Sequence, residues 1–174
     1  MLKEAALKEA WQRKYPEGVW LAVTMTPRGT PNAIALGWVM PVSGKPPLCA
    51  IAVGKTRFSH ECLKANPEFV LAIPSENQHA EMLYCGSHSG RDEEKFPACG
   101  FATAPSTKVR PPLLLGCCAN LECKVVAAYD GGDHTIFMGE ILASHADSDA
   151  PGRLYTLGGN RYGGVREVVK TQKG

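Results

Sequence analysis

Short apolar runs separated by glycine and proline are the dominant pattern of this chain. Three runs, 19–25, 32–42 and 46–53, are rich in Val, Ile, Trp and Ala and are divided by the turn sequences TPRGTP and SGKPP. The 174 residues include 18 Gly and 13 Pro, well above the usual share of about 12% for these two residues. Such punctuation indicates many turns and argues against a helix bundle. Short β-strands are therefore expected to dominate the fold.

The rest of the chain continues the strand pattern, with helices inserted between strands. A fourth run covers 69–73, and two further runs within 119–145 are joined at DGGD, the strongest hairpin signal in the sequence. Helices are expected after the segment GKTR, with Ser59 as a plausible N-cap, and over 76–84. About six strands with inserted helices suit a small closed or partly open barrel better than a sandwich of two sheets.

Composition excludes several classes of protein. No apolar run reaches the roughly 18 residues of a membrane span, and the first 18 residues lack the apolar core of a secretory signal. The formal charge of +2 is too small and too interspersed for nucleic acid or an anionic membrane to be the main partner. Seven scattered cysteines, an odd number, predict free thiols and a reducing, cytoplasmic environment.

The segment Val53 to Ser59 contains the parts of an anion site. Its GKT sequence is not a P-loop, because that motif requires a second glycine at position 49, where this chain has Cys49. What remains is a glycine loop after a strand, followed by Lys55, Arg57 and a helix N-terminus, all of which favour anions. An exposed loop with a capping serine explains the same residues equally well.

Other motifs have both a structural and a functional interpretation. On the strand 32–38, small side chains alternate with large ones, so a flat ring could lie against the bare face; ordinary barrel packing is the alternative. The string GSHSG has His88 where a nucleophile elbow needs serine, so no catalytic nucleophile is predicted. The cysteine spacings match no usual metal site, and none is predicted. His134, at a strand end, could meet a ligand at a barrel mouth.

Taken in order, several segments resemble the FMN-binding split-barrel flavin reductase family, and most closely its flavoredoxin-like branch. The segments are NAIALGW, SGKPPLCAIAV with KTRFSHECLKANPEFVLAIP, CGSHSGRDEEKF, and NLECKV with GGDHTIFMGEIL. The resemblance runs from about Val19 to His145. It implies a mainly β fold, a six-stranded Greek-key split barrel with short peripheral helices, and a homodimer with one FMN per subunit.

The resemblance also implies roles for individual residues and segments. Lys55, Arg57 and Ser59 would hold the FMN phosphate; the residues expected along or near the flavin ring are Asn32, Ala35, Trp38, Lys95 and His134, with Tyr162 as a weaker candidate. Residues 1–18 would be an N-terminal helix on the outside of the core, 19–150 the FMN-binding domain, and 151–174 a tail packing on or near the flavin.

The function implied is that of an oxidoreductase passing electrons from NADH or NADPH through FMN to flavin or to a redox protein partner. One alternative is a flavoredoxin-type electron carrier that does not use NAD(P)H directly. Another is a binding module without catalytic activity that holds haem or a different planar ligand on the same barrel. The residues assign no donor, acceptor or nicotinamide preference, because the sequence shows neither the acidic residue of a Rossmann site nor an arginine pocket for a 2′-phosphate.

Overall fold

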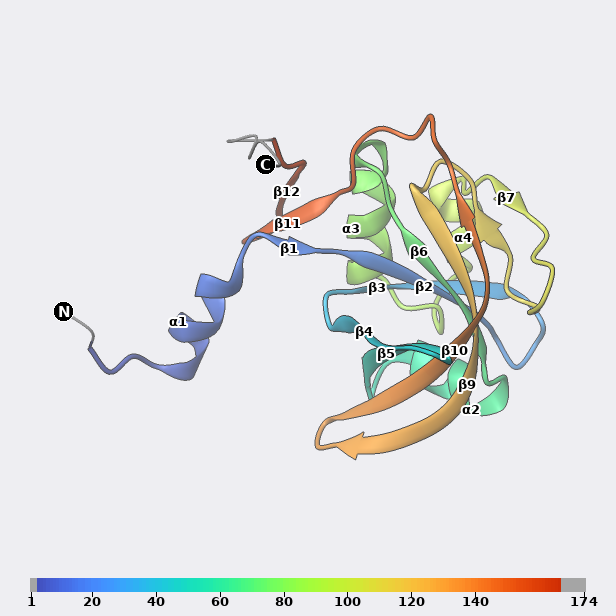
Figure 1. The fold of residues 1–174 in the computed structure, drawn as a ribbon, viewed down its shortest axis with the longest axis horizontal. Coiled ribbons are helices and arrows are strands. Elements are labelled where there is room, and N and C mark those ends of the chain that lie inside the picture. Colours follow the sequence, from blue (N-terminus) through green and yellow to red (C-terminus); the bar gives the residue numbers. More distant parts are fainter. Residues whose placement is uncertain (1–2, 167–174) are drawn as a thin grey trace.

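The main sheet is antiparallel and runs in the order β3-β2-β6-β9-β10-β5-β4 (Figure 1). The computed structural model describes residues 3–166. The strands of this sheet are β2 (Trp20–Met25), β3 (Pro31–Leu36), β4 (Val39–Gly44), β5 (Pro47–Gly54), β6 (Glu68–Ile73), β9 (Ala119–Gly131) and β10 (His134–Ala146). Two small sheets pair β1 (Glu17–Gly18) with β11 (Tyr155–Gly158) and β12 (Arg161–Gly163), and β7 (Thr103–Ala104) with β8 (Leu113–Leu114).

The main sheet curls until β3 and β5 meet. The backbone N–H of Ala52 donates to the carbonyl of Trp38 at 3.0 Å, next to the end of β3. The six strands other than β4 therefore make a barrel, which confirms the mainly β split-barrel prediction. The run 32–42, expected as one strand, is two strands, because the chain bends after Leu36 and β4 folds back along the outer edge of β5.

Side chains alternate between two apolar cores, as the period of a strand requires. On β2, Ala22 faces the barrel interior with Ile51 and Phe69. Its neighbours Leu21 and Val23 face a second core, which includes residues of the helices outside the sheet. Both faces of this part of the sheet are covered. The sequences of β2, β3 and β6 are therefore nearly continuously apolar instead of alternating between apolar and polar residues.

The helices expected after GKTR and over 76–84 are present, with one correction, whereas in the expected N-terminal helix only 7–14 of the described residues are helical and Leu7–Trp11 does not pack on the core. They are α1 (Leu7–Trp11) with the 3-10 turn η1 (Gln12–Lys14), α2 (Phe58–Ala65), η2 (Glu76–Gln78) leading into α3 (His79–Ser87), and α4 (Lys95–Cys99). Ser59 is not the N-cap of α2: Arg57 holds that position, and the buried Ser59 side chain bonds to β3 instead. No helix among residues 3–166 is long and apolar enough to cross a membrane.

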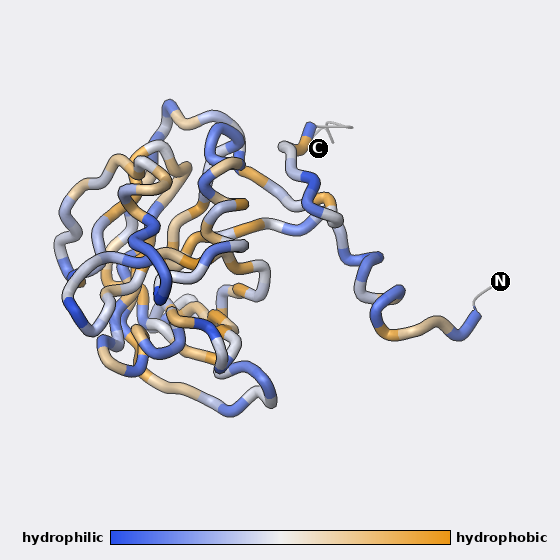
Figure 2. The backbone as a smooth tube through the Cα atoms, turned by 180° about the vertical axis from the view of Figure 1, so that it is seen from behind, coloured by the Kyte–Doolittle hydropathy of each residue, from blue (hydrophilic) through white to orange (hydrophobic). Residues whose placement is uncertain are grey.

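The N-terminal arm extends away from the barrel, and the C-terminal tail returns to meet it (Figures 1 and 2). Every residue of α1 is exposed, although the Trp11 ring lies 6.3 Å from that of Trp38. The tail is fastened by pairing of β11 with β1 and by the Arg153 guanidinium, 4.4 Å above the Trp20 ring. The predicted tail includes residues 167–174, which lie outside the described part of the chain.

A buried glutamate fastens the long connection between β7 and β8 to the barrel. Glu122 on β9 is fully buried and accepts hydrogen bonds from the backbone N–H groups of Thr107, Lys108 and Val109 and from the His145 ring. Burial alone would raise the pKa of this carboxyl, but the N–H of Thr107 and the His145 ring outweigh it and lower the pKa to about 2. The ionised carboxylate therefore accepts the backbone N–H groups of this loop, which have no partner in a helix or a sheet.

We expect Glu122→Gln to lower the free energy of unfolding by about 3 kcal/mol at pH 7, because a buried charge-assisted network is broken. Urea denaturation measures the change, with Glu4→Gln on the exposed N-terminal segment as the control. Since the folded pKa lies below the unfolded value, this contribution is complete above about pH 4.5 and is lost as pH falls toward 2. An equal loss in both variants would contradict the assignment.

Candidate functional site

Two adjoining cavities open beside β3. Their volumes are about 270 Å³ and 340 Å³, and both are lined by Ile34, Ala35 and Arg57. The first lies between β3, the start of α2 and the segment from α3 to α4. The second lies between β3, the N-terminal arm, the hairpin end of β10 and the tail. Together they form one groove, which has the size of a site for a small planar molecule with a charged end.

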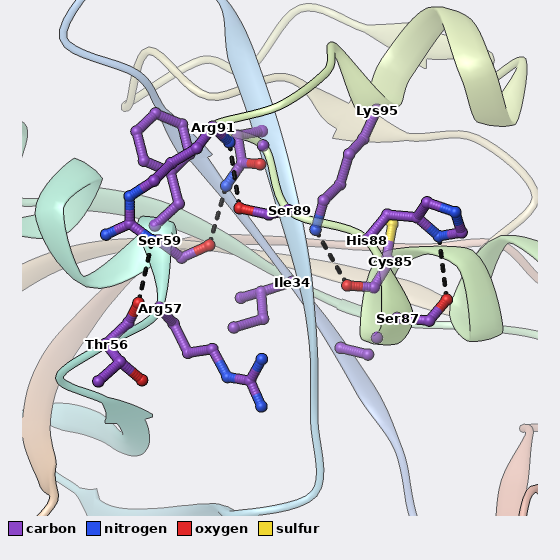
Figure 3. Close-up of a pocket in the computed structure, with 15 residues that line it drawn as sticks. Ile34, Thr56, Arg57, Ser59, Cys85, Ser87, His88, Ser89, Arg91 and Lys95 are labelled. Carbon is purple, nitrogen blue, oxygen red and sulfur yellow. Dashed lines mark hydrogen bonds between the residues drawn. The ribbon is translucent and has the colours of Figure 1, made fainter.

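The first cavity is polar and basic at its floor. Ser59 accepts a hydrogen bond of 2.8 Å from the side-chain amide of Asn32, which ties α2 to β3 (Figure 3). The amide oxygen of Asn32 is buried, and no residue of the described chain gives it a hydrogen bond. A buried acceptor without a donor costs free energy unless a ligand or water supplies one. The floor of the cavity is thus incomplete without a hydrogen-bond donor.

Lys95 brings a buried ammonium group into the same cavity. The residue is 4% exposed, and its Nζ donates to the carbonyls of Ala33 at 2.9 Å and Cys85 at 3.0 Å. Burial lowers the pKa of this lysine. Within residues 3–166 Lys95 forms no salt bridge, so its charge is held by backbone dipoles and one of its three protons remains for a ligand.

Arg57 and Lys95 reach the space around Ile34 from opposite sides (Figure 3). Arg57, the N-cap residue of α2, lines both cavities, and its guanidinium makes no hydrogen bond within the described chain. Arg91 lines the first cavity as well, but its guanidinium bonds to the Thr56 carbonyl at 3.0 Å and to Glu61. Arg57 is therefore the cation with free donors at the junction of the cavities.

The loop between α3 and α4 forms the outer wall of the first cavity and is held at several points. The Tyr84 hydroxyl donates to Glu93 at 2.5 Å, which raises the pKa of Tyr84 to about 12, and the Tyr84 ring stacks on His88 at 3.9 Å. Gly90 packs so closely on Asn32 that a β-carbon there would lie 2.2 Å from its amide oxygen. The absence of a side chain at Gly90 lets the loop approach the cavity floor.

Aromatic rings form the wall of the second cavity. The ring of His134 lies 4.7 Å from that of Trp38, and its Nδ1 is 2.6 Å from the carboxylate of Asp133, whose pKa this contact lowers. Tyr162 of the tail lines the same cavity, as does Lys14 of the arm, whose ammonium pairs with Glu17 and lies 6.0 Å from the centre of the Trp38 ring. This arrangement offers flat surfaces and a histidine to a planar ligand.

Eight of the nine predicted site residues line the two cavities, and one does not. Eight line the groove: Asn32, Ala35, Trp38, Arg57, Ser59, Lys95, His134 and Tyr162. Lys55 lines neither cavity, because its ammonium turns to Asp130 at 2.8 Å across the β9–β10 hairpin. Lys95 and His134 were both expected near one ring, yet they line different cavities.

Several lining residues were not singled out from the sequence. In the first cavity these are Thr56, Ser87, His88, Ser89 and Arg91, and in the second Lys14, Tyr15 and Glu17. The polar segment CGSHSGRDEEKF carried a usable signal, because it is a long glycine-rich loop that contains four of them. The arm carried no such signal: its residues reach the groove only through the pairing of β1 with β11.

Comparison with known proteins assigns the chain to a family. Residues 12–166 match the family described as flavin reductase like domain. The chain is 31% identical to an NADH-dependent FAD reductase of Streptomyces globisporus over 83% of this chain and 78% of the relative. It is 27% identical to the flavoredoxin of Methanosarcina acetivorans, with a TM-score of 0.80 over 91% of this chain and 89% of that one.

The chain belongs to the flavin reductase family. A flavin reductase of Pseudomonas putida is 26% identical over 94% of both chains, so the similarity extends beyond the barrel into both flanking segments. The protein is a flavin reductase-like oxidoreductase, and the groove beside β3 is its candidate flavin site.

The residues of the groove fit a flavin with a phosphate ester. A flavin offers O–H and N–H donors to a buried acceptor such as the Asn32 oxygen, and its phosphate suits the guanidinium of Arg57, which makes no hydrogen bond within residues 3–166. The second cavity contributes Trp38 and His134 as flat neighbours for a ring. We find no group of three or more metal-ligating side chains among residues 3–166.

We expect Gly90→Ala to weaken ligand binding in the first cavity more than tenfold while lowering the free energy of unfolding by about 1–2 kcal/mol, because the new β-carbon displaces the loop from Asn32. Isothermal titration with FMN and urea denaturation measure the two effects. Gly44→Ala is the control, since a β-carbon at Gly44 meets nothing within 4 Å. Unchanged binding in Gly90→Ala would show that the loop does not shape the site.

Proposed function

We propose that the protein binds FMN in the groove beside β3 and transfers electrons from NADH or NADPH through it. The observation that carries this proposal is the convergence of Arg57, Lys95 and the unpaired oxygen of Asn32 on one cavity of a flavin reductase-like barrel. When bound, the flavin supplies the redox chemistry, accepting a hydride equivalent and passing on electrons. The chain's own residues bind and orient the cofactor.

Arg57 and Ser59 are the proposed phosphate ligands. The Arg57 guanidinium makes no hydrogen bond among residues 3–166, and Ser59 lies in the first turn of α2, where backbone N–H groups and the helix dipole favour an anion. Asn32 and Ala35 of β3 would border the flavin, the first through its unpaired oxygen and the second through its small side chain. We leave Lys55 out of this set, since its ammonium already pairs with Asp130.

The second cavity is the proposed approach for the electron donor. The rings of Trp38 and His134 lie 4.7 Å apart there with a tilt of 38° between their planes, and Tyr162 lines the same cavity. The nicotinamide ring would lie against these rings, next to the flavin. Hydride transfer between two stacked rings needs no acid–base group, so no catalytic side chain is assigned.

An electron carrier without direct NAD(P)H use is the second candidate, favoured by the similarity to the flavoredoxin. The two candidates share the FMN site and differ only in whether the second cavity admits a nicotinamide. In the carrier, a redox protein would reduce the flavin instead. We keep the reductase as the main proposal because the relatives that match much of the chain include an NADH-dependent reductase and a flavin reductase.

Further features of the proposal concern assembly and organisation. We propose a homodimer, supported by exposed apolar side chains at Trp38, Met40 and Val42 and by an apolar groove of about 260 Å³ beside them. Residues 19–150 would be the FMN-binding domain, with 1–18 and 151–174 as flanking segments, and the cytoplasm would be its compartment, in keeping with the free thiols.

We expect Arg57→Ala to weaken FMN binding by about 3 kcal/mol, roughly 100-fold in Kd, because a charge-assisted pair in a partly buried site is lost. Fluorescence titration of FMN measures it. Lys55→Ala is the matched control: it removes a cation two residues away that lines neither cavity, and its Kd should stay within twofold. A larger loss in Lys55→Ala would reverse the assignment.

Anaerobic stopped-flow mixing of the FMN-loaded protein with NADH and with NADPH tests the reductase directly. We expect prompt bleaching of the blue flavin band with at least one nicotinamide, and slower bleaching in His134→Ala with the affinity for FMN retained. A flavin that stays oxidised with both nicotinamides but is reduced by dithionite would favour the carrier. A protein that binds no flavin would refute both candidates.

A further inference from the structure

An arginine joins the two sides of the first cavity beside the start of α2. Arg91, on the loop between α3 and α4, donates a hydrogen bond of 3.0 Å to the carbonyl of Thr56 (Figure 3). It donates a second to the carboxylate of Glu61 on α2, and the central carbon of its guanidinium lies 5.5 Å from the centre of the Phe58 ring. All three contacts are made to one segment, so Arg91 bridges the loop and the start of this helix.

The backbone of the same loop is packed tightly next to this bridge. A β-carbon at Gly90 would lie 2.2 Å from the amide oxygen of Asn32 and 2.9 Å from a ring carbon of Phe58. The loop backbone therefore lies against both β3 and α2 at this point. The Arg91 side chain is 40% exposed, so it forms the boundary between the cavity and the solvent.

The partners of Arg91 lie on either side of the proposed phosphate ligands along the chain. Thr56 precedes Arg57, and Glu61 follows Ser59 by two residues. Arg57, Ser59 and Arg91 line the first cavity together. A phosphate held by Arg57 and Ser59 therefore has the Arg91 bridge as its neighbour on the solvent side. A group esterified to that phosphate would have to pass the bridge.

We propose that the Arg91 bridge makes the groove selective for a flavin mononucleotide over a flavin dinucleotide, an inference that rests on the proposed function. FMN ends in a phosphate monoester, whereas FAD continues from the same phosphate into a second phosphate, a ribose and an adenine. The dinucleotide has to displace Arg91 from Thr56 and Glu61. It also brings its second phosphate toward the carboxylate of Glu61, and like charges at close range repel each other.

The size of the preference follows from what displacement of Arg91 removes. The exposed ion pair with Glu61 accounts for less than about fivefold in affinity, because solvent screens it. Loss of the hydrogen bond to the Thr56 carbonyl and of the contact with the Phe58 ring adds to this. With the repulsion at Glu61, we expect FMN to bind about 30-fold more tightly than FAD.

A double variant opens this end of the cavity without changing the net charge. Arg91→Ala alone would leave the Glu61 carboxylate facing an incoming second phosphate, so the test variant combines Arg91→Ala with Glu61→Gln. The matched control combines Arg13→Ala with Glu9→Gln. It removes another exposed arginine–glutamate pair, on the N-terminal arm, that lines neither cavity.

Isothermal titration of the full-length protein with riboflavin, FMN and FAD measures the three affinities, after chromatography has freed the FAD of FMN. We expect wild type and the control variant to prefer FMN to FAD by about 30-fold. In the Arg91→Ala/Glu61→Gln variant, the affinity for FAD itself should rise about tenfold. If circular dichroism shows that this variant is unfolded, Arg91→Lys replaces it. A lysine keeps the charge but has no planar fork to engage both partners, so the affinity for FAD should rise there as well.

Equal affinities of wild type for FMN and FAD would overturn the inference and leave the proposed FMN site standing. A preference that falls in the double variant only because FMN binds more weakly would also overturn it, since Arg91 would then be a phosphate ligand and not a barrier. FMN binding no tighter than riboflavin binding would instead refute the phosphate site of the proposed function, and this inference with it.

Discussion

A buried ammonium group holds the site together. Lys95 enters the space between β3 and α3 without a salt-bridge partner among the described residues, and its charge is balanced by the carbonyls of Ala33 and Cys85. Burying a charge in this way is costly unless hydrogen bonds compensate it. The two bonds join a barrel strand to a helix outside the barrel, so this contact helps to fix α3 against β3.

The strand β3 determines why one cavity is basic and the other is aromatic. Asn32 and Ser59 join the strand to α2 at the basic end, while the bend after Leu36 turns Trp38 toward His134 at the aromatic end. Ile34 and Ala35 lie between and line both cavities. One strand thus aligns the proposed phosphate site with the proposed ring-binding surface.

Much of the fold could be predicted from the sequence, because its signals are local. The hairpin at DGGD, the strand 69–73 and the helix after GKTR follow from turn residues and apolar patterns along the chain. Ser59 was misplaced as a cap because a buried partner 27 residues away, Asn32, competes for its hydroxyl. The break in the run 32–42 was missed for a similar reason: closure of the barrel, a long-range contact, sets where β3 ends.

By itself, the sequence determined the class of fold and most of the residue types in the candidate site. Strand period, turn residues and the order of motifs are local properties, so they can be recognised without the structure. Only the tertiary structure decided which of those residues share a cavity. It turned Lys55 to Asp130, left the Arg57 guanidinium without a hydrogen bond among residues 3–166, and placed Lys95 and His134 in different cavities. Side-chain direction and burial depend on contacts between distant segments, and no local pattern encodes those contacts.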